Sequence, residues 1–104
     1  MLLFKRKFRP AILSGEKTRT IRLWRNRHVK PGGVYFAPGI GYLRVSAVDE
    51  VTLDDLTEDD ARADGFASLA ALKAELDRLY ADAAHSNRRW YRIAFEYVGQ
   101  SRPA

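Results

Sequence analysis

The alternating pattern of residues 90–98 constrains the fold more than any other part of the chain. Two sets of side chains alternate along it, namely Tyr91, Ile93, Phe95 and Tyr97 against Trp90, Arg92, Ala94 and Glu96. A period of two is that of a β-strand whose two faces meet different surroundings. The chain is therefore predicted to contain a sheet, which this late strand is expected to close.

Four further strands are predicted at residues 2–7, 18–24, 34–37 and 42–48, because β-branched, aromatic and apolar residues gather there. A Pro31-Gly32-Gly33 turn precedes the strand at 34–37, and Pro38-Gly39-Ile40-Gly41 allows a tight hairpin between the last two. Alternation predicts that Leu43, Val45 and Ala47 share one buried face.

Three helices are predicted from their start and stop signals. Residues 8–13 form a short helix that Ser14-Gly15 ends, and a second helix begins after Thr57 and ends at Gly65. A longer helix follows Ser68, and its leucines fall on one face at spacings of three and four, at Leu69, Leu72, Leu76 and Leu79. This stripe is predicted to be core, and the polar residues 82–89 are predicted to form a loop.

Charge is distributed unevenly along the chain. Residues 5–30 hold ten Lys and Arg against Glu16 alone, a net charge of +9, whereas residues 49–64 hold eight acids against Arg62 alone, a net charge of −7. Clustered basic side chains attract phosphates and speed encounter with polyanions. The sequence therefore favours an anionic partner such as RNA or a nucleotide, with a solvated basic surface as the alternative.

Length and composition exclude several classes. The 104 residues suit one compact domain over residues 1–98, followed by a tail at 99–104 that is expected to be flexible. There are no cysteines, and His28 and His85 alone make a poor metal set, so no metal or cofactor is expected. The opening apolar run is too short for a membrane span. We expect a soluble cytoplasmic protein, monomeric or weakly dimeric.

Residues 15–22, Gly-Glu-Lys-Thr-Arg-Thr-Ile-Arg, carry the mixture of groups that suits binding of phosphate or of a polarised carbonyl. Neighbouring arginines would lower the pKa of Lys17 and let it act as a base, and Thr20 could attack as a nucleophile once a base removes its proton. In a regular strand, Arg22 and Trp24 share the face of Thr20, where they could hold a phosphate and stack a base. Each residue also has a purely structural alternative. Lys17 could face solvent, Thr20 could be an ordinary strand residue, and Trp24 could pack in the core. Arg19 and Arg22 could pair with the acidic segment 49–64.

Residues 10–24 resemble the signature of ASCH domains, small relatives of the PUA RNA-binding barrel. Later segments resemble that family in the same order, with a turn at Pro31-Gly32, the run 51–57, Ala63-Asp64-Gly65-Phe66, a leucine-rich helix and a closing aromatic strand. The predicted elements, about five strands and two or three helices, favour an α+β fold with a mixed or antiparallel sheet, and the resemblance implies that this sheet forms a small PUA-like mixed β-barrel covered by the helices. Its cleft would be lined by the signature segment.

The resemblance also implies candidate functions. The first is an RNA- or nucleotide-binding domain with a basic cleft, and the alternatives are a ribonuclease or an amidohydrolase that deacylates acetylcytidine. Lys17 and Thr20 fall on the lysine and threonine of the amidohydrolase branch, and Asp64 falls on its glutamate, one methylene shorter. The remaining ligand-binding candidates are Glu16, Thr18, Arg19, Arg22, Trp24, Lys30 and Arg44, with Ser14, Tyr42 and a phosphate contact at His28 ranked below them.

Overall fold

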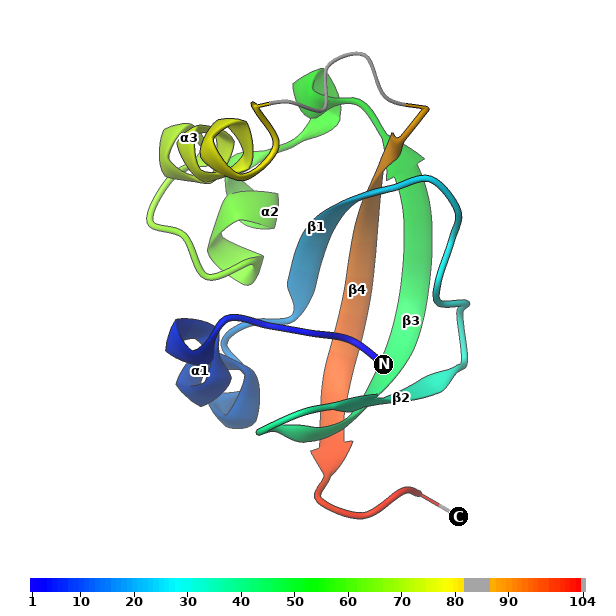
Figure 1. Cartoon of the computed structure of the whole chain (residues 1–104). Coiled ribbons are helices and arrows are strands. Elements are labelled where there is room, and N and C mark those ends of the chain that lie inside the picture. The colour runs from blue at the N-terminus through cyan, green and yellow to red at the C-terminus, as the bar shows by residue number, and fades with distance from the viewer. Residues whose placement is uncertain (82–86, 104) are drawn as a thin grey trace.

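A four-stranded antiparallel sheet forms the centre of the protein, and two helices pack beside its first strand (Figure 1). The computed structural model describes residues 1–81 and 87–103. Most of the predicted loop at 82–89, His85 included, and the last residue of the predicted tail lie outside this range. No helix of the described ranges is long and apolar enough to cross a membrane.

The strands are β1 (Arg19–Trp24), β2 (Val34–Ala37), β3 (Gly41–Val51) and β4 (Arg89–Gly99). Their order in the sheet is β1-β4-β3-β2, and every neighbouring pair is antiparallel. The alternating segment that became β4 thus lies in the middle of the sheet and pairs with β1 on one side and β3 on the other. It buries Tyr91, Ile93 and Phe95, as its pattern predicted.

The α+β class and the three helices are confirmed, and the sheet is antiparallel, which is one of the two arrangements that the sequence allowed. Two details of the predicted barrel are wrong, because the sheet of the described residues has four strands and is not closed. The predicted first strand at 2–7 makes a single backbone hydrogen bond to β2, from Leu2 N–H to the Phe36 carbonyl at 3.0 Å, and then turns into a 3₁₀ helix, η1 (Arg6–Phe8). One bond does not make a ladder, so this segment crosses the molecule as extended chain.

A β-bulge in β3 breaks the predicted alternation. Val45 pairs with Phe95 and Ala47 pairs with Ala94, so Ser46 is the extra residue on the β3 side. The bulge moves the buried position from Ala47, which is half-buried, to Val48, which is 7% exposed. β3 therefore keeps one face on the core as far as Val48, and Asp49 and Glu50 beyond it are exposed.

The helices are α1 (Arg9–Ser14), α2 (Glu58–Ala63) and α3 (Leu69–Leu79), with a short 3₁₀ helix η2 (Leu53–Asp55) before α2. The Thr57 hydroxyl accepts from the Asp60 N–H, and the Ser68 hydroxyl accepts from the Ala71 N–H, so both predicted caps are present. Gly15 ends α1 with φ 86°, a conformation that favours glycine.

Two apolar clusters hold these elements together. One lies on the sheet and includes Ile12, Leu43 and Ile93. The other joins β1 to α2 and α3 through Ile21, Ala61 and Leu72. The predicted leucine stripe of α3 is buried only at its centre, because Leu79 is 44% exposed and lies at the edge of a cavity.

Candidate functional site

Lys17 is a buried cation at the start of the site, with only 2% of its surface exposed. The turn at Gly15 leads into it, and its backbone N–H donates to the Ala11 carbonyl at 3.0 Å. Its ammonium Nζ donates to the Asp64 carboxylate, to the Asp64 carbonyl and, at 3.0 Å, to the Arg19 carbonyl. Each of the three ammonium protons therefore has an acceptor, which is what burial of a lysine requires.

Asp64 reaches Lys17 from 47 residues further along the chain. It follows the last residue of α2, and its backbone N–H donates to the Asp60 carbonyl at 2.9 Å. Strand β1 is tied to the same turn, because the Thr18 N–H donates to the Ala63 carbonyl at 2.8 Å. Two backbone contacts thus fix the end of α2 against the beginning of β1, and Asp64 is 5% exposed there.

Burial shifts both members of the Lys17–Asp64 pair toward their neutral forms. Loss of hydration lowers the pKa of Lys17; the attraction and hydrogen bond of Asp64 oppose this, and the nearby Arg22 adds to it. Loss of hydration also raises the pKa of Asp64. The positive charge of Lys17, the hydrogen bond from Lys17 and the hydrogen bond from the Ile21 backbone N–H lower this pKa and oppose the effect. The two groups form a coupled pair that shares its protons, so they titrate together.

Thr20 and Arg22 lie beside this pair on one face of β1, as the strand pattern predicted. Arg22 Nε donates to Thr20 Oγ1 at 2.9 Å, and Arg22 Nη2 donates to the Leu3 carbonyl at 2.6 Å. The guanidinium also lies 4.8 Å from the centre of the Phe4 ring. Thr20 is 5% exposed, and its hydroxyl accepts from Arg22 while its own proton stays available for transfer to a base.

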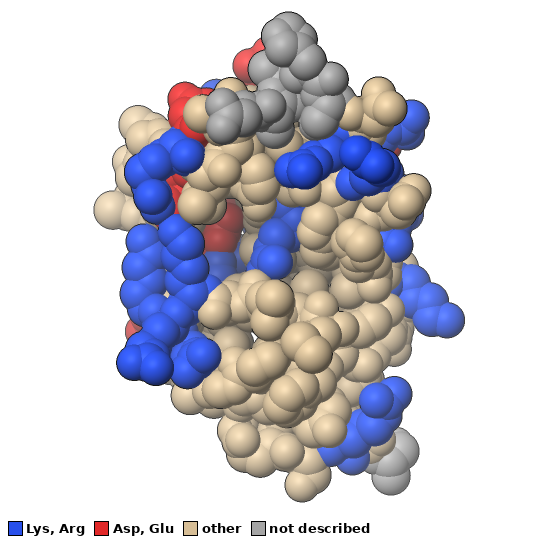
Figure 2. All heavy atoms as spheres, in the orientation of Figure 1, with Lys and Arg blue, Asp and Glu red and all other residues tan. Residues whose placement is uncertain are grey.

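These four polar residues line one cavity of about 260 Å³. Figure 2 shows a hollow in the face of the molecule with acidic and basic atoms inside it. The walls come from the N-terminal segment, β1, the end of α2 and α3, and they are largely apolar: Leu3, Phe4, Phe8, Ile21, Phe66, Leu72, Leu76, Leu79 and Tyr80. Lys5 and Glu75 complete the lining.

The other predicted ligand residues lie away from this cavity. Arg19 pairs with Asp60 at 2.9 Å, and Arg44 pairs with Glu96 at 3.2 Å. Asp60 belongs to the acidic segment, so Arg19 forms the ion pair that was predicted as its alternative role. Trp24 packs on His28 and Tyr91, with ring centres 4.8 and 6.1 Å away. Glu16 and Lys30 are exposed, as are Ser14 and His28, whereas Thr18 and Tyr42 are half-buried.

The aromatic walls of the cavity were not predicted from the sequence. Phe4 and Phe8 flank the basic triplet 5–7. A strand predicted over residues 2–7 gave no reason to expect contact between these rings and Lys17. In the structure, Lys17 Nζ lies 4.7 Å from the centre of the Phe8 ring. Phe66 packs on Phe8 at 5.6 Å between ring centres, from just beyond Asp64. Its place in the Asp64-Gly65-Phe66 run was the available signal.

The residues of the site do not include a metal-binding set, since no group of three His, Cys, Asp or Glu is close enough together anywhere in the described ranges. What the arrangement offers instead is an amine, a carboxyl group, a hydroxyl and a guanidinium at the bottom of an apolar cavity. That set can transfer protons, attack an acyl carbon and stabilise negative charge.

The fold is that of an ASCH domain, and the chain belongs to the ASCH family. It is 33% identical over 105 residues to the N(4)-acetylcytidine amidohydrolase of Klebsiella pneumoniae (strain 342), a match that covers 91% of this chain and 93% of that protein. No protein-family model matches the chain.

Solved structures show the same fold at low sequence identity. The hypothetical protein PH0355 superposes with a TM-score of 0.77 at 16% identity, over 92% of this chain and 95% of that one. The ASCH domain from Lactobacillus crispatus JV V101 gives 0.71 at 17% identity, over 84% and 67%. Protein EF3133 from Enterococcus faecalis V583 gives 0.70 at 16% identity, over 94% and 74%.

Proposed function

We propose that the protein is an amidohydrolase that removes the acyl group from the exocyclic nitrogen of an acylated cytosine nucleoside. The observation that carries this proposal is the meeting of Lys17, Thr20 and Asp64 in one cavity, with Lys17 bonded to Asp64. The similarity to a protein named N(4)-acetylcytidine amidohydrolase supports the choice of substrate. The shorter carboxylate at position 64 fits this role, because it contacts Lys17 without the extra methylene.

The first step is attack of Thr20 Oγ on the acyl carbon. Neutral Lys17 accepts the hydroxyl proton, and negative charge develops on the acyl oxygen as the tetrahedral intermediate forms. Arg22 is the charged group beside the hydroxyl, at 2.9 Å from Oγ1, and its guanidinium stabilises that charge. A desolvated site strengthens this attraction, and Thr20 is 5% exposed.

The Lys17–Asp64 pair supplies the base and the acid together. Since burial favours the neutral form of each group, a proton that moves from the ammonium to the carboxylate leaves an amine and a carboxylic acid in contact. The amine takes the threonine proton and the acid protonates the departing cytosine nitrogen as the C–N bond breaks. Lys17 then returns its proton to Asp64, which restores the pair.

Hydrolysis of the acyl-threonine ester completes the cycle. Water attacks the ester carbon, the amine of Lys17 accepts the water proton, and the same proton goes to Thr20 Oγ as the C–O bond breaks. The products are the free cytosine nucleoside and acetic acid, which releases its proton to the solvent and becomes acetate. Every proton taken up in one step is given back in another, so the protein ends in its starting state.

The apolar walls support a flat, uncharged ligand. Aromatic side chains give a pyrimidine faces to stack on, and Phe4, Phe8, Phe66 and Tyr80 all line the cavity. Its volume of about 260 Å³ lies just below the usual range for ligand pockets, which favours a single base with a small acyl group. The sugar would then remain at the mouth.

Recognition of an RNA or nucleotide by this cavity is the second candidate, and the cations at its mouth are the observation that favours it. Lys5, Lys7 and Arg78 surround Glu75, with N–O distances of 3.0, 3.8 and 2.7 Å, which leaves a local net charge of +2. A phosphate could share these cations. Cleavage of a bound RNA, the ribonuclease alternative, would use the same Lys17 and would be detected as shortened RNA in the same assay.

Hydrolysis of N4-acetylcytidine by the purified protein tests the proposal. Cytidine and acetate should form in equal amounts, and Thr20→Val should lower kcat/KM by at least about a thousandfold, because loss of a nucleophile removes the covalent route. Thr18→Val is the matched control: Thr18 is two residues away, does not line the cavity and should keep the parental rate. Absence of cytidine at micromolar enzyme would overturn the proposal, and RNA bound or cleaved without deacylation would favour the second candidate.

A further inference from the structure

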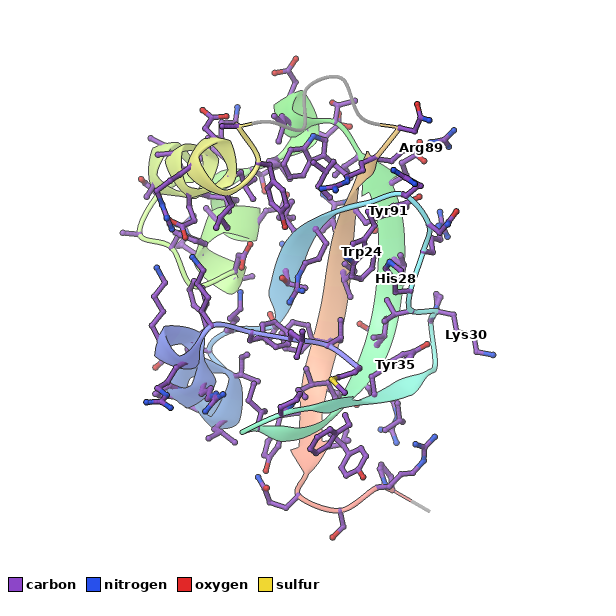
Figure 3. The ribbon with its side chains drawn as sticks, in the orientation of Figure 1. Trp24, His28, Lys30, Tyr35, Arg89 and Tyr91 are labelled. Carbon is purple, nitrogen blue, oxygen red and sulfur yellow. The ribbon has the colours of Figure 1, made fainter. Side chains whose placement is uncertain are left out.

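A second concave surface lies on the connection between β1 and β2, away from α2 and α3 (Figure 3). It is a groove of about 300 Å³ lined by Arg27, His28, Val29, Lys30, Pro31 and Tyr35. None of these residues lines the cavity of Lys17. Arg27 and Lys30 are positively charged, so the groove is cationic as well as concave.

The connection that forms this groove is fastened to the body of the protein. Val29 is 4% exposed, and the Lys30 N–H donates to the Tyr35 hydroxyl at 2.9 Å. The Gly32 N–H donates to the Val45 carbonyl at 2.7 Å, and the Val45 N–H donates to the Gly33 carbonyl at 2.9 Å. The groove is therefore held in shape before any ligand arrives, which lowers the cost of binding.

Gly33 allows the Tyr35 ring to take part in this arrangement. A Cβ atom at position 33 would meet the Tyr35 ring, with 2.5 Å to its hydroxyl oxygen. The ring thus occupies the space that a side chain at 33 would fill, and its hydroxyl comes under the Lys30 N–H. The glycine and the tyrosine together set the path of the backbone that carries Lys30.

The cations of this surface are not neutralised by the protein itself. Among the described residues, Arg25, Arg27 and Lys30 form no ion pair, whereas the cations at the cavity mouth share Glu75 and two arginines of the sheet share Asp60. The run 25–30 contains no acidic residue. Figure 2 also shows Lys and Arg atoms gathered near the end of β1. Fixed, unopposed positive charges repel one another and attract a polyanion.

Aromatic rings lie next to these cations. His28 is exposed and meets Trp24 edge-on, with ring centres 4.8 Å apart, and Trp24 in turn packs on Tyr91. The Arg27 guanidinium lies 5.5 Å from the centre of the Tyr91 ring. Rings with flanking cations grip unpaired bases and their phosphates, whereas the bases of a duplex have no free faces.

We propose that the surface formed by residues 25–31 and Tyr35 binds single-stranded nucleic acid. Arg25, Arg27 and Lys30 contact the phosphates, and one base stacks on the ring of His28, which is held by its edge-on contact with Trp24. This site is separate from the cavity of Lys17, so the inference stands whether or not the protein deacylates a nucleoside.

Binding of a fluorescein-labelled oligouridylate of twelve nucleotides tests this inference, measured by anisotropy over a series of salt concentrations. Arg27→Gln with Lys30→Gln should weaken binding about tenfold or more at low salt. The slope of log K against log salt should become shallower by about 1.4, because each lost contact to a single-strand phosphate is worth about 0.7. His28→Ala should weaken binding about fivefold or more at every salt concentration.

Arg62→Gln with Arg102→Gln is the matched control, because both side chains are exposed, lie outside the groove and the cavity, and carry the same total charge. It should leave the oligouridylate affinity within about twofold of the parent. Equal losses in the two double variants would overturn the inference, since binding would then follow net charge alone. An equal fall in affinity for inorganic polyphosphate after His28→Ala, or equal binding of a duplex, would overturn it as well. Acetylcytidine turnover in the same variants reports separately on the cavity.

Discussion

Replacing Asp64 by asparagine should expose how much the protein depends on neutralising Lys17. The substitution keeps the shape of the side chain but removes the counter-charge of an ammonium group that is 2% exposed. The charged acceptor is lost, and the backbone carbonyls of positions 64 and 19 remain as the acceptors that the parent structure already provides. Breaking a buried ion pair in this way costs about 3–5 kcal/mol, although the intact pair contributes little net stability.

The free-energy cost also has an upper bound that depends on pH. Lys17 can escape the penalty by losing its proton, and its ordinary pKa of 10.5 lies 3.5 pH units above pH 7. At 1.36 kcal/mol per unit the bound is about 4.8 kcal/mol at pH 7 and about 2 kcal/mol at pH 9. The unfolded chain binds the extra proton, so the stability of the variant rises with pH relative to the parent.

Urea unfolding at pH 7 and pH 9, monitored by tryptophan fluorescence, measures both the free-energy cost of the substitution and its change with pH. Asp59→Asn is the matched control, because Asp59 lies on the same helix with 83% of its side chain exposed and pairs with Arg62 at 3.2 Å. It should change the free energy of unfolding by no more than about 0.5 kcal/mol. A loss below about 1 kcal/mol for Asp64→Asn at pH 7, or above about 3 kcal/mol at pH 9, would refute the reasoning.

Three further outcomes are expected. Hydrogen bonds from Arg78 and Lys5 lower the pKa of Glu75 from 4.5 to about 2. The ionised carboxylate therefore stabilises the protein above pH 4.5, and this stabilisation is lost as pH falls toward 2. Glu75→Gln should remove this pH-dependent loss from an acid-denaturation curve, and an unchanged curve would contradict the prediction. Asp60 is 1% exposed and pairs with two arginines. Asp60→Asn should lower the free energy of unfolding in urea by about 2–5 kcal/mol. It should also raise KM and lower kcat, because α2 would shift. Gly15→Ala, at φ 86°, should lower the free energy of unfolding by about 1–2 kcal/mol, and a stabilised variant would speak against the left-handed turn.

Local sequence signals predicted most of the secondary structure because they act within a few residues. Gly15 ends α1, Thr57 and Ser68 begin α2 and α3, and alternation marks β4. The order of the strands was not predictable in the same way. β4 lies between β1 and β3, and that choice depends on pairing between segments far apart in the chain, which no local pattern encodes.

The candidate site shows the same division. Lys17, Thr20 and Arg22 share one short segment, so strand geometry could place the last two on one face. The contact of Lys17 with Asp64 came only through the family resemblance, because 47 residues separate them. The aromatic walls depend on an N-terminal segment whose residue types favour a strand. Beyond Leu2, however, this segment forms no backbone ladder with another strand of the described residues.

Peptide mapping by mass spectrometry during turnover of N4-acetylcytidine tests the central claim most directly. In a reaction quenched before steady state, an acetyl group should be found on Thr20 of the parent protein. Thr20→Val should show neither the adduct nor turnover, whereas Thr18→Val should show both. A Thr20→Val variant that deacylates acetylcytidine at the parental rate would contradict the account. The attacking group would then not be the Thr20 hydroxyl, which lies beside Arg22 and the Lys17–Asp64 pair.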